Sequence, residues 1–457
     1  MTSYRTLNPS TGELLRTFPL AEASAVERAV ASAASAFSHW KTSSHEERRK
    51  LLYAAANGLE SRSDVLARTV SLEMGKVLEE AKQEVSRCAR VCRYFADNGE
   101  ALLADEERDA SGEGRALTAC DPLGPILAIM PWNFPLWQVF RCAAPALAAG
   151  NTILLKHAPN TPQCAEAIAA LFSEAGAPSG LFQNLFLSNE QAASVLQDRR
   201  VVCASLTGSV RAGRSIAGTA GAHLKKVVLE LGGSDPFIIC EDADGDRAVK
   251  AALSFRLMNN GQSCISPKRI LVQRRRFGEI RDKVVQGFRA RRVGDPLDPM
   301  SENGPMARED LRDALLDQVR RSIAQGATLV CGAEVPSRPG FFVSPGVLEN
   351  PPPGSAARCE ELFGPIAVLV PFDSEEEAVQ IANETAFGLG ASIWTADETR
   401  GSTLARRIDA GCVFINGGVR SEPPLPFGGI KDSGLGRELG REGIREFANI
   451  KTVRIFP

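Results

Sequence analysis

Residues 259–266 read NNGQSCIS and place one thiol, that of Cys264, on a polar loop rich in glycine and amide side chains. An apolar helical pattern precedes the loop, and the strand-like Arg269-Ile270-Leu271-Val272 follows it. A nucleophilic thiol must be reachable and must ionise, and a loop end with nearby N–H donors allows both. Cys264 is the only one of eleven cysteines in such a setting, so we expect it to be a nucleophile. An ordinary buried cysteine is the alternative.

On both sides of this loop, short apolar runs alternate with helical patterns. In the first series we expect strands at 126–130, 152–156, 184–187, 201–207 and 226–229, with helices beginning near residues 135, 161, 189 and 209. In the second series we expect strands near 236–240, 268–272, 366–370, 391–394 and 412–416. This alternation predicts an α/β protein with parallel, doubly wound sheets. Two amphipathic helices, at 22–38 and about 62–97, precede the first series.

Composition describes an ordinary globular chain of two or three domains, with 457 residues and 44% hydrophobic side chains. The formal net charge is −2 and there is no long charge block, which argues against nucleic acid or an anionic membrane as a partner. No apolar run is long enough to span a membrane, and the first residues do not resemble a signal peptide. The scattered cysteines include no CxxC pair, so we expect no metal site and a reducing, cytoplasmic location.

Four further motifs occur in order with the cysteine loop. They are PWNFP at 131–135, ELGG at 230–233, EELFGP at 360–365 and PFGGIK at 426–431. Together the five resemble the aldehyde dehydrogenase superfamily, and the resemblance runs from near Asn8 to Val453. It implies an aldehyde dehydrogenase-like fold, with two doubly wound parallel-sheet domains and a small β oligomerisation element.

The resemblance also supplies domain limits that composition does not reveal. It implies a dinucleotide-binding domain at 1–103 and 123–231, and a catalytic domain at 232–430. The oligomerisation element would comprise 104–122 and 440–457, which implies a homodimer or homotetramer. Residues 450–456 read as a strand that could extend another subunit's sheet, or form an edge strand of its own domain.

Three residues would carry the chemistry. Cys264 would attack an aldehyde carbonyl, and Asn133, after a strand end, would donate to the developing oxyanion together with the Cys264 N–H. Glu230 ends an apolar run beside Gly232 and Gly233, so burial would raise its pKa toward neutrality and suit it to activate water. It matches the family's general base, and its presence favours hydrolysis over acyl transfer to coenzyme A. A turn role for Asn133 is the alternative.

For the cofactor, residues 207–213 follow a strand and open a helix, which places backbone N–H groups against a phosphate. Lys156 matches a lysine that contacts the adenosine ribose. Pro159 occupies the position where many NAD-preferring relatives have glutamate, so we expect NADP to be tolerated and the cofactor to be NAD or NADP. The other candidate cofactor residues are Trp132, Gly208, Ser209, Gly213, Leu231, Glu361 and Phe363.

Arg141 is the candidate substrate anchor. It lies eight residues after Asn133, about two helical turns, within a nearly uncharged helix. In the succinate-semialdehyde branch of the family an arginine at this spacing binds the substrate carboxylate, and a structural ion pair is the alternative. The remaining substrate candidates are Trp137, Ser263, Ser421 and Phe427.

These observations predict NAD(P)-dependent oxidation of an aldehyde through a thiohemiacetal and a thioester, with succinic semialdehyde as the expected substrate. A first alternative is the same reaction on an uncharged or aromatic aldehyde. A non-catalytic structural or binding protein on the same scaffold and a cofactor-independent thiol hydrolase are the alternatives from other classes.

Overall fold

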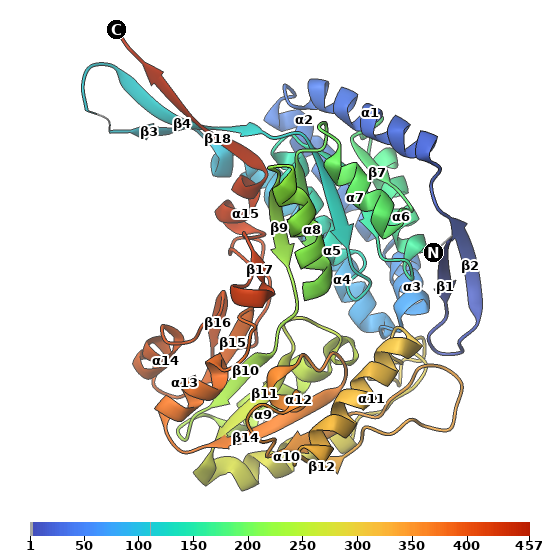
Figure 1. The fold of residues 1–457 in the computed structure, drawn as a ribbon, viewed down its shortest axis with the longest axis vertical. Coiled ribbons are helices and arrows are strands. Elements are labelled where there is room, and N and C mark those ends of the chain that lie inside the picture. The colour runs from blue at the N-terminus through green and yellow to red at the C-terminus, as the bar shows by residue number, and fades with distance from the viewer. Residues whose placement is uncertain (1–2, 110) are drawn as a thin grey trace.

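The computed structural model describes residues 3–109 and 111–457, which form two large sheets and one small sheet (Figure 1). The first large sheet has six strands in the order β17-β9-β8-β5-β6-β7, parallel except for β17. Its strands are β5 (Pro125–Met130), β6 (Thr152–His157), β7 (Phe182–Asn184), β8 (Cys203–Thr207), β9 (Lys226–Glu230) and β17 (Gly434–Leu435). The connecting helices are α5 (Trp137–Ala148), α6 (Pro162–Glu174), α7 (Asn189–Gln197) and α8 (Val210–Ala222).

The second large sheet has seven strands in the order β12-β13-β14-β11-β10-β15-β16, parallel except for β12. They are β10 (Asp235–Ile239), β11 (Pro267–Gln273), β12 (Thr328–Cys331), β13 (Gly346–Glu349), β14 (Ile366–Phe372), β15 (Gly390–Trp394) and β16 (Cys412–Ile415). The helices around this sheet are α9 (Gly245–Leu257), α10 (Phe277–Arg289), α11 (Glu309–Ala324), α12 (Ala356–Cys359), α13 (Glu375–Asn383) and α14 (Glu398–Ala405). The predicted α/β class with two doubly wound sheets is confirmed.

Each large sheet has a hydrophobic core on both faces, as the continuous apolar runs of its strands require. In β5, Ile126 and Ala128 pack into one core while Leu127 packs into the opposite one. In β10, Ile238 faces one core and Phe237 and Ile239 face the other. Both sheets are therefore held rigidly between helices, and the loops at their strand ends are fixed relative to each other.

The amino-terminal region departs from the expected pair of helices. It contains a hairpin, β1 (Ser3–Leu7) and β2 (Leu14–Pro19), then α1 (Ala23–Trp40), α2 (His45–Ser61), α3 (Ser63–Met74) and α4 (Leu78–Leu103). The single helix predicted at about 62–97 is wrong, because Gly75 ends α3 in the left-handed conformation with φ +81°. A Cβ there would lie 2.8 Å from Pro305, so Gly75 also allows the second sheet's loops to approach.

The strand predicted at 184–187 was also placed too late. The structure has β7 at Phe182–Asn184, and Leu185 and Leu187 are buried in the adjoining loop. An apolar pattern at a strand end cannot distinguish ladder residues from loop residues that pack against the same core.

A three-stranded antiparallel sheet projects from the body of the molecule (Figure 1). Its order is β18-β4-β3, with β3 (Glu106–Arg108), β4 (Arg115–Pro122) and β18 (Ala448–Ile455), and α15 (Gly440–Glu446) leads into it. The tail strand pairs with β4 of its own chain along its whole length, from Ala448 opposite Pro122 to Ile455 opposite Arg115. The other edge of β18 has no partner strand among the described residues. In those same residues, no helix is long and apolar enough to cross a membrane.

Candidate active site

The cysteine loop begins with a left-handed turn. Asn259, Asn260 and Gly261 have φ values of 53°, 56° and 70°, a conformation that asparagine and glycine tolerate better than other residues. A Cβ on Gly261 would lie 2.3 Å from the Gly364 carbonyl oxygen, so only glycine fits there. This turn ends α9 and delivers Cys264 to the carboxyl-terminal side of the preceding helix, just before β11.

Cys264 lines a cavity of about 250 Å³ together with Asn133 and Glu230. The structure therefore brings the three residues predicted to be catalytic to one place. Cys264 was expected on an accessible, flexible loop, but its residue is only 9% exposed. The thiol is reached through the cavity, where water is scarce and electrostatic interactions are strong.

Cys264 and Glu230 lie together in the cavity, and Glu230 Oε1 has no hydrogen-bond partner among the described residues. Burial raises the pKa of the thiol well above its usual value, and the adjacent negative charge of Glu230 raises it further. Burial also raises the pKa of Glu230. A thiol beside a basic, buried carboxylate has an acceptor for its proton within the cavity itself.

Arg141 lies behind Glu230 and is 1% exposed. Its Nε is 2.6 Å from Oε2 of Glu438, and its Nη2 is 3.3 Å from Oε2 of Glu230. Nη2 also donates to Thr207 Oγ1 at 3.1 Å. The guanidinium is thus shared by two buried carboxylates. This geometry favours the structural ion pair over the substrate anchor, because a carboxylate substrate would have to displace a protein carboxylate.

Asn133 is held by the cysteine loop. Its Nδ2 donates to the Gln262 carbonyl at 3.1 Å, and its own carbonyl accepts from Asn259 Nδ2 at 2.7 Å. The following turn is fixed by Glu84, whose Oε1 accepts the Leu136 and Trp137 N–H groups at 2.8 and 3.0 Å. The cysteine loop holds one Nδ2–H and the main-chain carbonyl of Asn133, which preorganises the second Nδ2–H to donate into the cavity.

Six of the nine predicted cofactor residues line the same cavity: Trp132, Gly208, Ser209, Leu231, Glu361 and Phe363. Ser209 caps α8 by accepting the Ala212 N–H, so the positive end of this helix faces the cavity edge. A Cβ on Gly213 would lie 2.6 Å from Leu231, which shows that this glycine allows α8 to pack against the ELGG turn. These features fit a dinucleotide whose pyrophosphate lies at the helix terminus and whose nicotinamide enters the cavity.

Lys156 and Pro159 lie outside the cavity, near the carboxyl end of β6. Burial lowers the pKa of Lys156 to about 8. Gly213 likewise contributes packing and no lining surface. The three positions are consistent with an adenosine end that extends away from the reacting centre.

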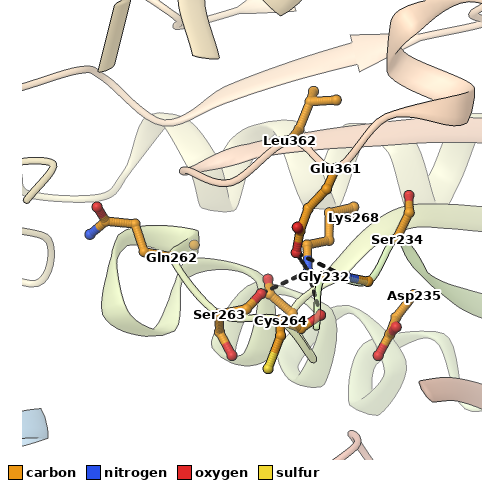
Figure 2. A network of polar contacts seen from close by, with 12 residues as sticks. Gly232, Ser234, Asp235, Gln262, Ser263, Cys264, Lys268, Glu361 and Leu362 are labelled. Carbon is orange, nitrogen blue, oxygen red and sulfur yellow. Dashed lines mark hydrogen bonds and ion pairs between the residues drawn. The ribbon is translucent and has the colours of Figure 1, made fainter. Parts of the chain in front are cut away.

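Glu361 reaches the cavity from the loop after α12, and the ELGG glycines make room for it (Figure 2). Its Oε1 accepts the Gly233 N–H at 3.1 Å. A Cβ on Gly232 would lie 2.4 Å from Glu361 Oε2, and one on Gly233 would lie 2.8 Å from the Cys264 carbonyl. The two glycines admit protein groups, the Glu361 carboxylate and the nucleophile's own backbone.

Two of the other substrate candidates, Trp137 and Ser421, contact a residue that the sequence did not single out. Arg87 of α4 donates from Nη2 to the carbonyl and Oγ of Ser421, at 2.6 and 2.8 Å, and its guanidinium stacks 4.1 Å from the Trp137 ring centroid. Arg87 is partly exposed, and it forms no ion pair within the described part of the chain. Phe427 lies instead under the Arg141 guanidinium, at 4.9 Å.

Four further residues that shape the site were missed: Glu84, Arg87, Lys268 and Glu438. Lys268 had a sequence signal, because a charge at the start of the apolar run Ile270-Leu271-Val272 is costly unless it is paired. Glu438 had none, since its partner Arg141 is about three hundred residues away in the sequence. Ser263, the remaining candidate, is buried, and its Oγ has no hydrogen-bond partner among the described residues.

One cavity brings together the Cys264 thiol, the Glu230 carboxylate, the restrained Asn133 amide and six residues predicted to bind a dinucleotide. The model of the aldehyde dehydrogenase family matches residues 1–453 of this sequence. The chain belongs to the aldehyde dehydrogenase family.

Individual members of this family resemble the chain along its whole length. A succinate-semialdehyde dehydrogenase (NADP+) from Mycobacterium bovis is 48% identical over 98% of this chain and 99% of its own. A probable succinate-semialdehyde dehydrogenase (NADP+) from Synechocystis is 47% identical over the same shares. The crystal structure of a succinic semialdehyde dehydrogenase from Streptococcus pyogenes with NADP+ superposes with a TM-score of 0.97, at 38% identity, over 99% of this chain and 100% of that one.

Proposed function

We propose that this aldehyde dehydrogenase oxidises succinic semialdehyde to succinate, with NADP+ as electron acceptor. The observation that carries the reaction is the shared cavity of Cys264, Glu230 and Asn133. The observation that carries the substrate class is Arg87, a cation with no carboxylate partner among the described residues, which contacts the predicted substrate residues Ser421 and Trp137. The relatives named above support the same substrate and cofactor.

In the first half of the reaction, Glu230 accepts the thiol proton as Cys264 Sγ attacks the aldehyde carbon. The carbonyl oxygen becomes an oxyanion, which accepts hydrogen bonds from the Asn133 Nδ2–H and the Cys264 backbone N–H. The buried setting strengthens both hydrogen bonds because little water competes for the donors. The product of this step is a thiohemiacetal on Cys264.

A nicotinamide dinucleotide, when bound, would supply the hydride acceptor that this oxidation to a thioester requires. Glu230 releases the thiol proton to solvent and then removes a proton from water as the water attacks the thioester on Cys264. The Cys264 thiolate leaves and regains its proton from Glu230. Glu361 would hold the nicotinamide ribose, with Phe363 and Trp132 as neighbouring walls whose ring centroids are 5.8 Å apart. Overall, aldehyde, water and the oxidised dinucleotide give carboxylic acid, reduced dinucleotide and a proton.

The preference for NADP+ rests on Pro159, which follows the β6 strand three residues after Lys156. A glutamate at this position would accept a ribose 2′-hydroxyl and repel a 2′-phosphate, whereas proline does neither. Lys156 supplies a positive charge nearby.

Arg87 is the proposed partner of the substrate's distal carboxylate. Ser421 and Trp137 fix its guanidinium. Desolvation, followed by the nearby positive charge of Arg141, lowers the pKa of Arg87 to about 10. At neutral pH the group remains charged and forked, which suits a carboxylate. Arg141, whose charge is matched by Glu230 and Glu438, would act on Glu230 and not on the substrate.

Comparison of two variants separates these roles. We expect Arg87→Leu to lower kcat/KM for succinic semialdehyde by about 100-fold and for butanal by less than about threefold, because only the first substrate has a carboxylate. Arg141→Leu should lower kcat/KM for both aldehydes to the same extent, because it disturbs Glu230. Steady-state kinetics with both aldehydes measures this. A selective effect of Arg141→Leu, with none of Arg87→Leu, would restore Arg141 as the anchor.

The function itself is tested by following reduced dinucleotide with succinic semialdehyde and with butanal, each with NAD+ and NADP+. Butanal has the same four-carbon skeleton but no carboxylate. We expect a kcat/KM ratio above about 100 in favour of the semialdehyde, roughly 2.7 kcal/mol, and a lower KM for NADP+ than for NAD+. A ratio near one would favour an uncharged or aromatic aldehyde as substrate.

The domain limits and the assembly expected from the sequence remain proposals. We propose dinucleotide binding by 1–103 and 123–231, catalysis by 232–430, and assembly through 104–122 and 440–457. The unpartnered edge of β18 supports pairing with another copy as a homodimer or homotetramer, which light scattering would distinguish.

Eleven free cysteines support a reducing, cytoplasmic location.

A further inference from the structure

Lys268, the second residue of β11, is a fully buried lysine whose ammonium group faces three oxygen atoms. Its Nζ donates to the Ser263 carbonyl at 2.7 Å and to the Cys264 carbonyl at 2.5 Å, and lies 3.3 Å from Glu361 Oε1 (Figure 2). An ammonium has three N–H donors, so every donor has an acceptor. Two of these acceptors are the carbonyls on either side of the nucleophile's Cα atom.

The hydrogen bond from Lys268 Nζ to the Ser263 carbonyl determines where the Cys264 N–H points. The Ser263 carbonyl and the Cys264 N–H belong to one peptide plane, and the described chain contains no cis peptide. In a trans peptide the C=O and N–H bonds point in opposite directions. Because Lys268 lies on the carbonyl side, the Cys264 N–H is turned away from it. Within the described residues no acceptor for this N–H is present.

We propose that Lys268 is a positioning residue that holds the Cys264 peptide so that its N–H serves as an oxyanion donor. The inference rests on the proposed function, since it concerns the oxyanion formed on Cys264. Without Lys268, the Cys264 carbonyl loses the lysine donor in a buried site and the Ser263 carbonyl keeps only the Ser266 N–H at 3.2 Å, so the peptide is held less firmly. The donor would then be misplaced even though Cys264 remains in the cavity.

Other buried cations near the loop do not duplicate this role. Arg256 donates to carbonyls of Gly261, Leu362 and Gly364, and so braces the start of the loop and the Glu361 segment. Arg141 contacts carboxylates and no backbone of the cysteine loop. Lys268 alone among these three holds the peptides that flank Cys264.

Two reactions of Cys264 separate this positioning role from a general effect on the fold. Cleavage of 4-nitrophenyl acetate transfers an acetyl group to the thiol through a tetrahedral oxyanion and requires no dinucleotide. Alkylation by iodoacetamide is a displacement at a saturated carbon and forms no such oxyanion. We expect Lys268→Met to lower acetyl transfer by about 100-fold, the effect of losing one oxyanion donor. Alkylation, compared at matched thiolate fraction, should fall by less than about tenfold.

Lys283→Met is the matched control, because Lys283 lies on α10 with an exposed side chain and pairs only with surface carboxylates. It should leave both rates unchanged.

If Lys268→Met does not fold, Lys268→Gln retains two N–H donors, and its ratio of acetyl transfer to alkylation should still fall several-fold. Equal losses in both reactions, an unchanged ratio, or absence of ester cleavage by the wild-type protein would overturn the inference. Failure of the wild type to oxidise aldehydes would instead count against the proposed function, because the ester assay contains neither aldehyde nor dinucleotide.

Discussion

Cys264→Ala should abolish aldehyde oxidation, with kcat reduced by at least about 10⁴-fold. The methyl group cannot form a thiohemiacetal, and Glu230 and Asn133 then surround an aldehyde to which no covalent bond is made. Loss of a thiol that is 9% exposed removes little buried volume, so the fold should persist. The absorbance of reduced dinucleotide measures the rate, and circular dichroism verifies the fold.

Cys331→Ala is the control, since Cys331 lies on β12 at the far edge of the second sheet. It should oxidise aldehyde at the wild-type rate. Substantial aldehyde turnover by Cys264→Ala would remove the central claim of the mechanism, and would direct attention to an oxidation route without a covalent intermediate.

Glu230→Gln should slow hydrolysis of the thioester much more than formation of the thioester. The variant loses the acceptor of the Cys264 thiol proton, but it also loses the negative charge that raises the pKa of that thiol, so thioester formation should slow less than hydrolysis. Hydrolysis of the thioester lacks a base and should slow by about 10²- to 10⁴-fold. Rapid-mixing experiments would then show a burst of reduced dinucleotide, and mass spectrometry would show the acyl group on the protein.

The pH profile gives this prediction a second measurement. Burial raises the pKa of Glu230, and only the ionised carboxylate can accept a proton. In the wild type, hydrolysis should therefore decline as the pH falls through this raised pKa. The acidic decline should be absent in Glu230→Gln. An unchanged steady-state rate in the variant would exclude Glu230 as the base.

Sequence patterns predicted most of the strands and the three central side chains, for a local reason. Strands such as Thr152–His157 are buried on both faces and read as unbroken apolar runs. Cys264 and Glu230 lie beside glycines that protein groups must approach closely, and these glycines are visible in the sequence. Features that depend on neighbouring residues in the chain can therefore be predicted from the sequence alone.

Contacts between residues that are distant in the sequence could not be predicted from it. Arg141 has the spacing of a substrate anchor, but Glu438 neutralises it from the other end of the chain. Arg87 looks like one more polar residue of an amphipathic helix until Ser421, 334 positions later, is placed against it. A helical repeat also continues across Gly75, although the backbone turns there.

The link between Arg141 and Glu438 makes the end of the chain part of the catalytic electrostatics. Glu438 immediately precedes α15, which leads to the projecting strand β18. Burial raises the pKa of Glu438 to about 7, so its charge, and with it the balance of charge around Glu230, varies near neutrality. The segment that leads into the projecting sheet therefore also supplies a carboxylate that balances the charge beside Glu230. Displacement of that segment should lower activity without changing any residue that lines the cavity.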